Sequence, residues 1–320
     1  HDTHEIRSVI DPESSIHPAN VTATCGRCHE GSNPTFAQSY THAGALKARG
    51  YHGWARLIYL CLIAVVLGGM AVHNLVVARY ELQSRLRRRS HEPSILRWRT
   101  SERGQHLVLL LSFFGLAITG FALRFPDAWW VRLLGLGGHE AIRAILHRAL
   151  AAIMTAVFLY HMVWVIVTRR GRAAVGGLAP RASDLVHLFQ NMGFYLGLRK
   201  ERPAFEVFDY TQKAEYWAVV WGTLVMGLTG FVLWFPTVVT AWLPAWVVRV
   251  SEVVHFYEAV LAVSAIFVWH LFYVIFIPSQ YPMSTIWLNG RMPAVEFKEM
   301  HRGAYDRSAK NADNDPTRDR

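Results

Sequence analysis

Two stretches of this sequence each place a pair of histidines on one apolar helix. His255 and His270 lie near opposite ends of one stretch, and His147 and His161 near opposite ends of the other. At a rise of about 1.5 Å per residue, fifteen residues separate two imidazoles by roughly 22 Å along the axis and keep them within about 60° of one face. Two such helices that face each other would clamp two planar cofactors at two depths. The spacing therefore predicts a membrane cytochrome b with two haems.

A second chemical motif, Cys25-Gly-Arg-Cys28-His29, lies near the N-terminus. Two cysteines two residues apart and followed by histidine form the attachment motif of c-type haem, in which the histidine ligates the iron. A redox dithiol would need a βαβ pattern around it, and a zinc site would need a second pair of ligands. The motif predicts at least one haem c on a periplasmic segment. The sixth ligand is left open: His42 is placed first, and the alternatives are His4, His17 and His52.

The segment around this motif also resembles the end of a multihaem cytochrome c. The matching stretches are His1-Asp-Thr-His4-Glu-Ile6, Asp11-Pro-Glu-Ser14 and Asn20-Val-Thr-Ala-Thr-Cys25. The resemblance implies that His1 ends an earlier haem motif whose cysteines are missing from this chain. We then expect the 320 residues to be the tail of a longer electron-transfer protein.

The composition favours a membrane protein over a nucleic-acid-binding one. The chain is 52% hydrophobic and 13% aromatic, and it carries a net charge of +10. Its apolar residues cluster into long blocks, and its arginines lie in short loops beside those blocks, as the positive-inside rule expects. The third cysteine, Cys61, lies inside an apolar block as a small hydrophobe, so no disulfide framework is expected.

Five apolar blocks are long enough to span a bilayer, at about 57–77, 106–123, 145–167, 216–235 and 253–277. The fold class predicted is an all-α integral membrane protein, with a four-helix haem-binding core, one N-terminal helix and a small periplasmic segment. Eight arginines after the first block place that side in the cytoplasm of a bacterial inner membrane. The N-terminus is then periplasmic and the C-terminus cytoplasmic.

Four domains follow from these blocks: a c-haem segment at 1–52, the first transmembrane helix at 53–80, a dihaem cytochrome b domain at 81–290 and a cytoplasmic tail at 291–320. The amphipathic stretch 183–198 is expected to lie on the membrane surface. The tail is expected to begin with a short helix and to end disordered.

The topology sets the depth of each histidine, and a haem held by two histidines needs both at one depth. On the periplasmic side only His147 and His255 qualify, so we pair them. The cytoplasmic side offers His106, His161 and His270, and His73 near the inner end of the first block is a further candidate. We pair His106 with His270 there. A set of merely hydrogen-bonded histidines is a poor alternative, because burying polar groups in hydrocarbon costs several kcal/mol each.

Two cytoplasmic-side histidines remain after this pairing. His161 is a candidate for a second-shell position, a quinone site or a third haem. His73 is left open between a packed polar residue and a functional group. An internal echo, Gly115–Pro126 against Gly227–Pro236, supports duplication of the helix pair. Its glycines either admit a flat porphyrin or allow close helix packing, and the sequence does not choose between these.

Residues 100–305 resemble the cytochrome b subunit of formate dehydrogenases and of related hydrogenase and thiosulfate reductase anchors. The resemblance rests on Asp209-Tyr-Thr-Gln212-Lys213-Ala-Glu-Tyr-Trp217, Thr229–Trp234, His255, His270 and the stretch Met283–Tyr305. It implies four core helices, two b haems and a quinone site near the cytoplasmic haem. By motif, its haem ligands fall on His106, His147, His255 and His270.

The same resemblance implies a role for the start of the fourth block. The family's Tyr-Asn-x-x-Gln-Lys motif, which lies by the quinone, falls on Asp209, Gln212 and Lys213. An aspartate replaces the family's asparagine, so hydrogen bonding to the quinone differs here, or the acid relays protons.

The function expected is a quinol:cytochrome c-type electron conduit. Electrons would pass between quinone, such as menaquinone, and periplasmic multihaem cytochromes or a periplasmic oxidoreductase subunit, through two b haems and haem c. Membrane lipid is the other expected partner, and nucleic acid is not. One alternative is a haem-containing anchor whose partner handles quinone, and another is a helix bundle without haem. The direction of electron flow is left open.

Overall fold

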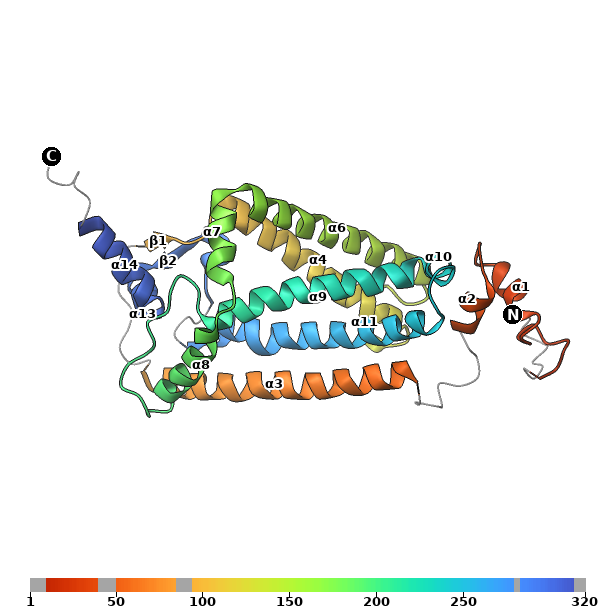
Figure 1. Ribbon diagram of the computed structural model, residues 1–320, viewed down its shortest axis with the longest axis horizontal. Helices are drawn as coiled ribbons and strands as arrows, with labels where there is room; N and C mark the ends of the chain where they lie inside the picture. Colours follow the sequence, from red (N-terminus) through yellow and green to blue (C-terminus); the bar gives the residue numbers. More distant parts are fainter. Residues whose placement is uncertain (1–9, 40–49, 85–93, 279–282, 314–320) are drawn as a thin grey trace. The chain divides into compact units, whose positions relative to one another are not determined.

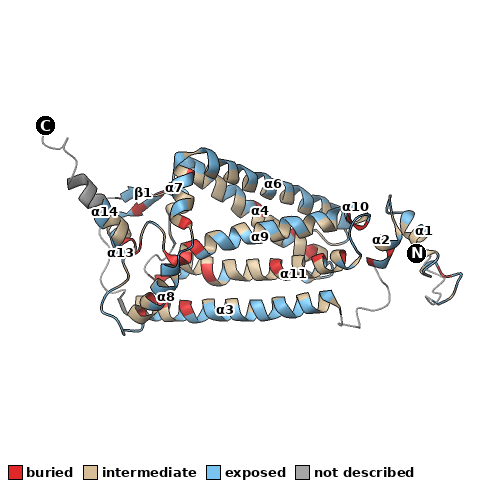
Figure 2. Ribbon diagram, viewed as in Figure 1, coloured by how far each residue is buried: buried red, intermediate tan, exposed pale blue. Residues whose placement is uncertain are grey.

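The structure is a computed structural model that describes residues 10–39, 50–84, 94–278 and 283–313. Five of its helices are long and apolar enough to cross a membrane (Figure 1). They are Tyr51–Leu82, Thr100–Arg124, Glu140–Val167, Tyr210–Trp234 and Trp246–Phe276. At most 17% of the most apolar window of each helix is buried inside the protein. Figure 2 shows exposed positions along α3, α4 and α6, and such apolar faces suit contact with lipid. The predicted all-α membrane fold with five spans is confirmed.

The helices and strands run in the following order along the described chain. They are α1 (Val21–Gly26), α2 (Pro34–Ser39), α3 (Tyr51–Ser84), β1 (Ser94–Leu96), α4 (Thr100–Arg124), α5 (Trp129–Leu133), α6 (Glu140–Val167), α7 (Arg169–Leu178), α8 (Ala182–Tyr195), α9 (Tyr210–Trp234), α10 (Pro236–Thr240), α11 (Trp246–Ala265), the π-helical turns η2 (Ile266–His270) and η3 (Phe272–Phe276), α12 (Ile286–Asn289), β2 (Arg291–Pro293), α13 (Ala294–Met300) and α14 (Arg302–Asp313).

Contacts divide the chain into two compact units, and helices α3, α9 and α11 each contribute residues to both. Unit 1 comprises residues 1–68 and 222–264, and unit 2 comprises residues 69–221 and 265–320. In unit 2, α4 and α6 pack along each other (Figure 1). A small core of Val77, Tyr195 and Ile277 joins α3, α8 and the end of the fifth span. In unit 1, α2 packs against α10.

Local chemistry fixes where several of these helices begin and end. Thr168 has extended backbone angles after α6, and its hydroxyl accepts a hydrogen bond from the Gly171 amide at 2.9 Å, which caps α7. Gly171 has no room for a side chain, because a Cβ there would lie 2.5 Å from the Trp164 carbonyl oxygen. Pro236 follows the end of α9 and occupies the first turn of α10, where its missing N–H is tolerated. These breaks turn the chain at the ends of the spans.

The segment after the fifth span is more structured than the sequence suggested. Strand β2 pairs antiparallel with β1, with Ile95 opposite Met292. Gly290 takes a left-handed conformation (φ 76°) that ends α12, and a Cβ there would lie 2.1 Å from the Trp98 carbonyl oxygen. The prediction of a tail with only a short helix was incomplete, because the pairing of strands almost 200 residues apart leaves no local signal.

Candidate functional site

His147 in α6 is held by a threonine of the preceding span. Its Nδ1 lies 3.0 Å from the Thr119 hydroxyl oxygen, and that hydroxyl lies 2.7 Å from the Gly115 carbonyl oxygen one turn back in α4. A hydroxyl has one proton, and a carbonyl oxygen can only accept, so the proton goes to Gly115. Thr119 must then accept from His147 Nδ1–H. This fixes the tautomer and makes Nε2 the nitrogen that would ligate a metal.

His255 in α11 has the same arrangement within unit 1. Its Nδ1 lies 2.9 Å from the Thr229 hydroxyl oxygen, which donates to the Val225 carbonyl at 2.7 Å. The next residue after each threonine is a glycine that faces the imidazole: a Cβ on Gly120 would lie 3.0 Å from His147 Cε1, and one on Gly230 would lie 3.4 Å from His255 Cε1. Each Thr-Gly pair therefore orients an imidazole: the threonine hydroxyl binds Nδ1, and the glycine leaves room for the ring edge against the helix backbone.

His147 belongs to unit 2 and His255 to unit 1, so their pairing stays a prediction. His106 and His270 both belong to unit 2, and their ring centroids lie 6.3 Å apart at an interplanar angle of 44°. With a metal–nitrogen bond of about 2 Å on each side and about 1.1 Å from a ring nitrogen to its centroid, two imidazoles on one iron have centroids roughly 6 Å apart. The spacing fits a shared haem iron.

The surroundings of this pair also suit an iron ligand. His270 lies in the π-helical turn η2, and such turns are frequent at functional sites. Its Nδ1 lies 3.4 Å from Glu215 Oε2 on α9, and a carboxylate behind a ligating imidazole orients it and raises its basicity. His106 Nδ1 is buried without a hydrogen-bond partner among the described residues.

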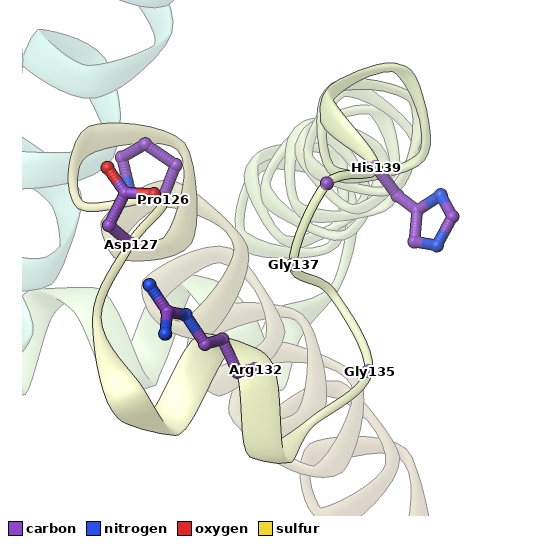
Figure 3. Close-up of a pocket in the computed structure, with 7 residues that line it drawn as sticks. Pro126, Asp127, Arg132, Gly135, Gly137 and His139 are labelled. Atoms are coloured by element: carbon purple, nitrogen blue, oxygen red, sulfur yellow. The ribbon is translucent and has the colours of Figure 1, made fainter.

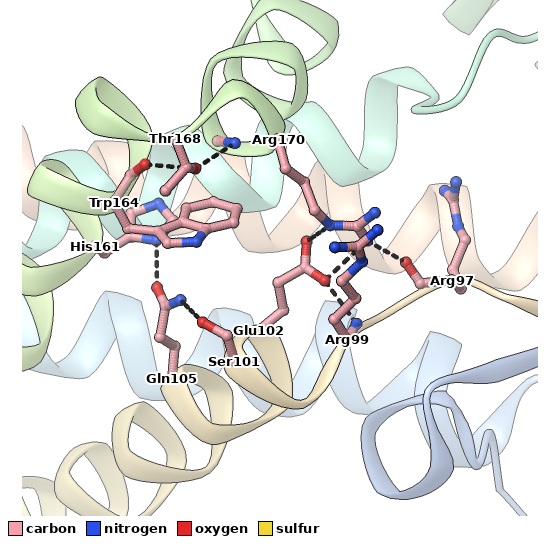
Figure 4. A network of polar contacts seen from close by, with 10 residues as sticks. Arg97, Arg99, Ser101, Glu102, Gln105, His161, Trp164, Thr168 and Arg170 are labelled. Carbon is pink, nitrogen blue, oxygen red and sulfur yellow. Dashed lines mark hydrogen bonds and ion pairs between the residues drawn. The ribbon is translucent and has the colours of Figure 1, made fainter.

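His161 uses both ring nitrogens in hydrogen bonds. Nδ1 lies 2.8 Å from Gln105 Oε1, which accepts, so Nε2 accepts from the Tyr216 hydroxyl at 3.1 Å. The ring stacks on Trp164 (Figure 4). The same figure shows Arg170 forming a two-pronged ion pair with Glu102, at 2.8 and 2.9 Å. This network favours a hydrogen-bonded position for His161 over iron ligation, which would break the contact with Tyr216.

The other three quinone-site candidates lie at the start of α9 or directly before it, and they make structural contacts. Asp209 Oδ1 accepts from the amides of Thr211 and Gln212 at 2.9 and 3.0 Å, and Gln212 Oε1 faces the Asp209 amide at 3.3 Å. This reciprocal pattern is a capping box at the start of α9. Lys213 Nζ lies 2.7 Å from Asp184 Oδ1 in a largely buried ion pair. The aspartate that replaces the family's asparagine is therefore a good helix N-cap in its own right.

A buried polar cluster stands beside the start of α9. His301 is fully buried, its Nδ1–H donates to the Glu206 carbonyl at 2.8 Å, and its Nε2 faces Arg97 at 3.5 Å. Burial, reinforced by the charge of Arg97, lowers the pKa of His301 to about 4. Burial also lowers the pKa of Arg97, to about 10. The neutral imidazole ties the C-terminal segment to the loop before α9.

The predicted c-haem motif lies at the end of the short helix α1. Cys25 is half-buried, Cys28 and His29 are exposed, and both cysteines are free thiols. The His29 ring lies 5.1 Å from Phe36 of α2. Among the candidates for the sixth ligand, His17 Nδ1 accepts from the Ala19 amide at 3.2 Å. His52 is half-buried at the start of α3, and His42 and His4 lie outside the described residues.

Sequence reasoning missed several polar groups inside the spans. Glu258 is only 6% exposed, one turn after His255, and hydrogen-bonds with Tyr59 of α3. Its Oε1 lies 3.2 Å from the position of a Cβ on Gly222. A carboxyl group within an apolar span was itself a signal, because such groups are rare in membranes and usually functional. Glu215 and the two threonines gave a weaker signal. For the threonines, that signal was the position of both Thr-Gly pairs inside the repeated stretches Gly115–Pro126 and Gly227–Pro236.

None of the predicted site residues lines the hollow in the loop between α4 and α6. This hollow has a volume of about 440 Å³ (Figure 3). Its lining includes Asp127, Arg132 and His139, together with glycines at 135, 137 and 138. The four histidines proposed as haem ligands lie instead on the membrane spans.

Comparison with known families identifies the family of this chain. Residues 97–280, which are 184 of the 320, match the family described as prokaryotic cytochrome b561, and the chain belongs to that family. The chain is a multi-pass bacterial membrane protein of the b-type cytochrome class. It serves as a haem b electron-transfer subunit. No curated protein matches the chain.

Proposed function

We propose that this member of the prokaryotic cytochrome b561 family holds two b haems and one c haem, and carries electrons between a membrane quinone and periplasmic redox partners. The observation that carries the proposal is the repeated threonine–imidazole contact. Thr119 and Thr229 each accept from a histidine Nδ1–H while donating to their own helix. A histidine that merely filled space would not need its tautomer fixed by the same device in both halves of an internal echo.

The proposed ligands are His147 with His255 for one b haem, and His106 with His270 for the other. Bound haem iron would supply one-electron redox chemistry, and the chain's residues set its position and electronics. Glu215 would strengthen His270 as a ligand by accepting from Nδ1–H. The 6.3 Å between the His106 and His270 rings supports their sharing one iron.

The c haem would be held by Cys25, Cys28 and His29. Support comes from the way this segment packs within unit 1. The Asn33 side chain caps α2 by accepting from the Phe36 amide at 2.8 Å, and it donates to the Thr240 hydroxyl of α10 at 3.3 Å. Because α10 and α11 are joined by a short loop, this contact favours transfer between the haem at His255 and the haem at Cys25 and Cys28.

The quinone would react near His270, at the start of α9. Gln212 and Glu215 lie within one turn of each other on that helix, and Glu215 contacts His270. Asp209, Gln212 and Lys213 would then shape the quinone site while capping the helix. His161 would contribute through Tyr216 and Gln105.

The proposed orientation follows the positive-inside rule, with the c-haem segment periplasmic and the C-terminal segment cytoplasmic. The four regions proposed from the sequence, 1–52, 53–80, 81–290 and 291–320, would then be a c-haem segment, an added helix, a dihaem domain and a tail. Periplasmic multihaem cytochromes or an oxidoreductase subunit would exchange electrons with haem c.

A pyridine haemochrome assay on the purified chain tests the haem content. We expect two b haems and at least one c haem, and reduction of the b haems when a quinol is added. His255→Ala and His270→Ala should each remove one b haem, whereas His139→Ala, in the loop between α4 and α6, should remove none. Full b-haem content in both ligand variants, or no reduction of the intact protein by any quinol, would refute the proposal.

The capping contacts favour one second candidate function. If Asp209, Gln212 and Lys213 only stabilise the start of α9, the chain is a haem-containing anchor of a periplasmic oxidoreductase, and its partner handles quinone. Gln212→Ala separates the two functions. Loss of quinol-driven haem reduction with full haem content supports the conduit, and unchanged turnover supports the anchor.

A further inference from the structure

His73 is buried between two phenols in unit 2. Its Nε2 lies 2.8 Å from the Tyr210 hydroxyl oxygen, and its Nδ1 lies 3.2 Å from the Tyr273 hydroxyl oxygen. The three residues come from α3, the first position of α9 and η3. Helix α3 lies outside the region that matches the family, so the match does not include this imidazole.

The three side chains carry more protons than their two contacts use. A neutral imidazole has one N–H, and each phenol has one O–H, which makes three protons for two hydrogen bonds. If Nδ1 is protonated, it donates to Tyr273, and Tyr210 donates to Nε2. If Nε2 is protonated, both directions reverse. In either tautomer one phenol keeps a proton with no acceptor among the described residues. The triad is therefore able to pass a proton along by switching tautomers.

One end of the triad meets a polar group of residues. The Asn191 side-chain amide donates to the Tyr210 oxygen at 3.0 Å, and Arg202 donates to Asn191 at 3.3 Å and to the Tyr195 oxygen at 2.6 Å. Arg202 is partly exposed. This end of the triad is therefore the one nearest to a partly exposed cation, and Asn191 holds the phenol in place.

The other end meets an unsatisfied polar atom beside the proposed haem ligand. Trp269 packs against His73 with centroids 4.7 Å apart and against Tyr273 at 5.5 Å, and it directly precedes His270. Trp269 is only 9% exposed, and its Nε1–H has no partner among the described residues. Asn74 is 6% exposed, and its side-chain amide donates to the carbonyl of Val268, the residue before Trp269. A buried donor left open needs a polar molecule to satisfy it.

We propose that Tyr210, His73 and Tyr273 form a proton relay that exchanges protons between the polar end at Arg202 and a quinone bound beside Trp269. The inference rests on the proposed quinone chemistry. For each proton delivered, Tyr210 takes a proton from water and gives its own to His73 Nε2. Nδ1 gives its proton to Tyr273, whose hydroxyl proton passes to the quinone oxygen. Two such transfers, with two electrons from the haems, convert quinone to quinol, and the reverse sequence oxidises quinol.

A packing role alone explains the triad less well. A buried neutral imidazole is satisfied by one acceptor and one donor, whereas each phenol also carries a proton, so the triad holds one proton more than its two contacts use. The charged groups that act on the triad are Asp209 and Glu215 of α9 and its start, and Arg202 of the loop after α8. They bring both signs of charge to the triad.

The relay is tested with the full chain in lipid nanodiscs, by following haem b absorbance after addition of a quinol. His73→Ala should slow quinol-driven reduction about a hundredfold, within the range for loss of a general acid–base group. Tyr273→Phe and Tyr210→Phe should slow it too, while keeping the ring packing. Reduction by dithionite, which needs no proton transfer from quinol, should be unchanged. Tyr80→Phe removes a phenol of the same helix outside the triad and serves as the control.

Added imidazole should restore part of the rate of His73→Ala but not that of Tyr273→Phe. A structural role predicts no such rescue. The relay is refuted if the three variants reduce as fast as the Tyr80→Phe control, or if His73→Ala is slow and imidazole has no effect. If His73→Ala does not fold, the two phenylalanine variants carry the test. If the unaltered protein does not react with quinol, the proposed quinone function is refuted, and the relay that depends on it is refuted as well.

Discussion

Replacing Thr229 by valine tests whether the threonine contacts tune a haem ligand. Valine keeps the branched shape but removes the acceptor of His255 Nδ1–H, which lies 2.9 Å away. A hydrogen bond of this kind contributes about 1 kcal/mol net. The imidazole becomes a weaker donor to iron, which favours the reduced state. At 59 mV per tenfold for one electron, about 1 kcal/mol raises the haem midpoint potential by roughly 40 mV.

Thr155→Val is the matched control for this prediction. The Thr155 hydroxyl donates to the Ala151 carbonyl at 2.8 Å in α6, and the structure gives it no imidazole contact. It therefore loses the same intrahelical bond without touching a ligand. Redox titration of the haem absorbance measures the potential, and electron paramagnetic resonance reports the orientation of the imidazole planes. A potential in Thr229→Val that matches that in Thr155→Val would refute the tuning role.

The double variant Thr119→Val with Thr229→Val addresses the pairing of His147 with His255. If both imidazoles ligate one iron, the two shifts add on a single haem, to roughly 80 mV for two contributions of about 1 kcal/mol. If they ligate different irons, two haems each shift by about half of that amount. The number of shifted components in the titration decides between these outcomes.

Three further predictions concern other residues of the structure. Glu215→Gln should raise the midpoint potential of the haem at His270, since a neutral amide supports the imidazole less than a carboxylate does; an unshifted titration would speak against it. The stability that depends on His301 should be fully present above pH 6.5 and be lost as pH falls through 4, by up to about 3 kcal/mol, because the unfolded chain binds the proton more readily. Thermal unfolding in detergent checks this, and His301→Gln, which does not titrate, should flatten the profile. Asn33→Ala should slow electron transfer between haem b and haem c without changing haem content, since it removes the contact with Thr240; flash-induced kinetics as fast as in the unaltered chain would contradict it.

The sequence alone determined the features that depend on local or periodic patterns. Long apolar blocks specify spans because every backbone group in lipid must be bonded within its own helix. The motif from Cys25 to His29 predicts c-haem attachment from five adjacent residues, and helix geometry places His255 and His270 near opposite ends of one span. The resemblance seen from sequence motifs covers residues 100–305, and the match to cytochrome b561 covers residues 97–280 of the same part of the chain.

Only the tertiary structure decided how these residues are held. The carboxylate of Glu215 behind His270 and the two phenols around His73 join segments that are not neighbours in sequence. The tautomer of His255 follows from one contact in the structure: the Thr229 hydroxyl donates to the Val225 carbonyl of its own helix, so it accepts from His255 Nδ1–H. Residue types set which chemistry is available, whereas hydrogen-bond direction and burial, which choose among these chemistries, arise only when the helices pack.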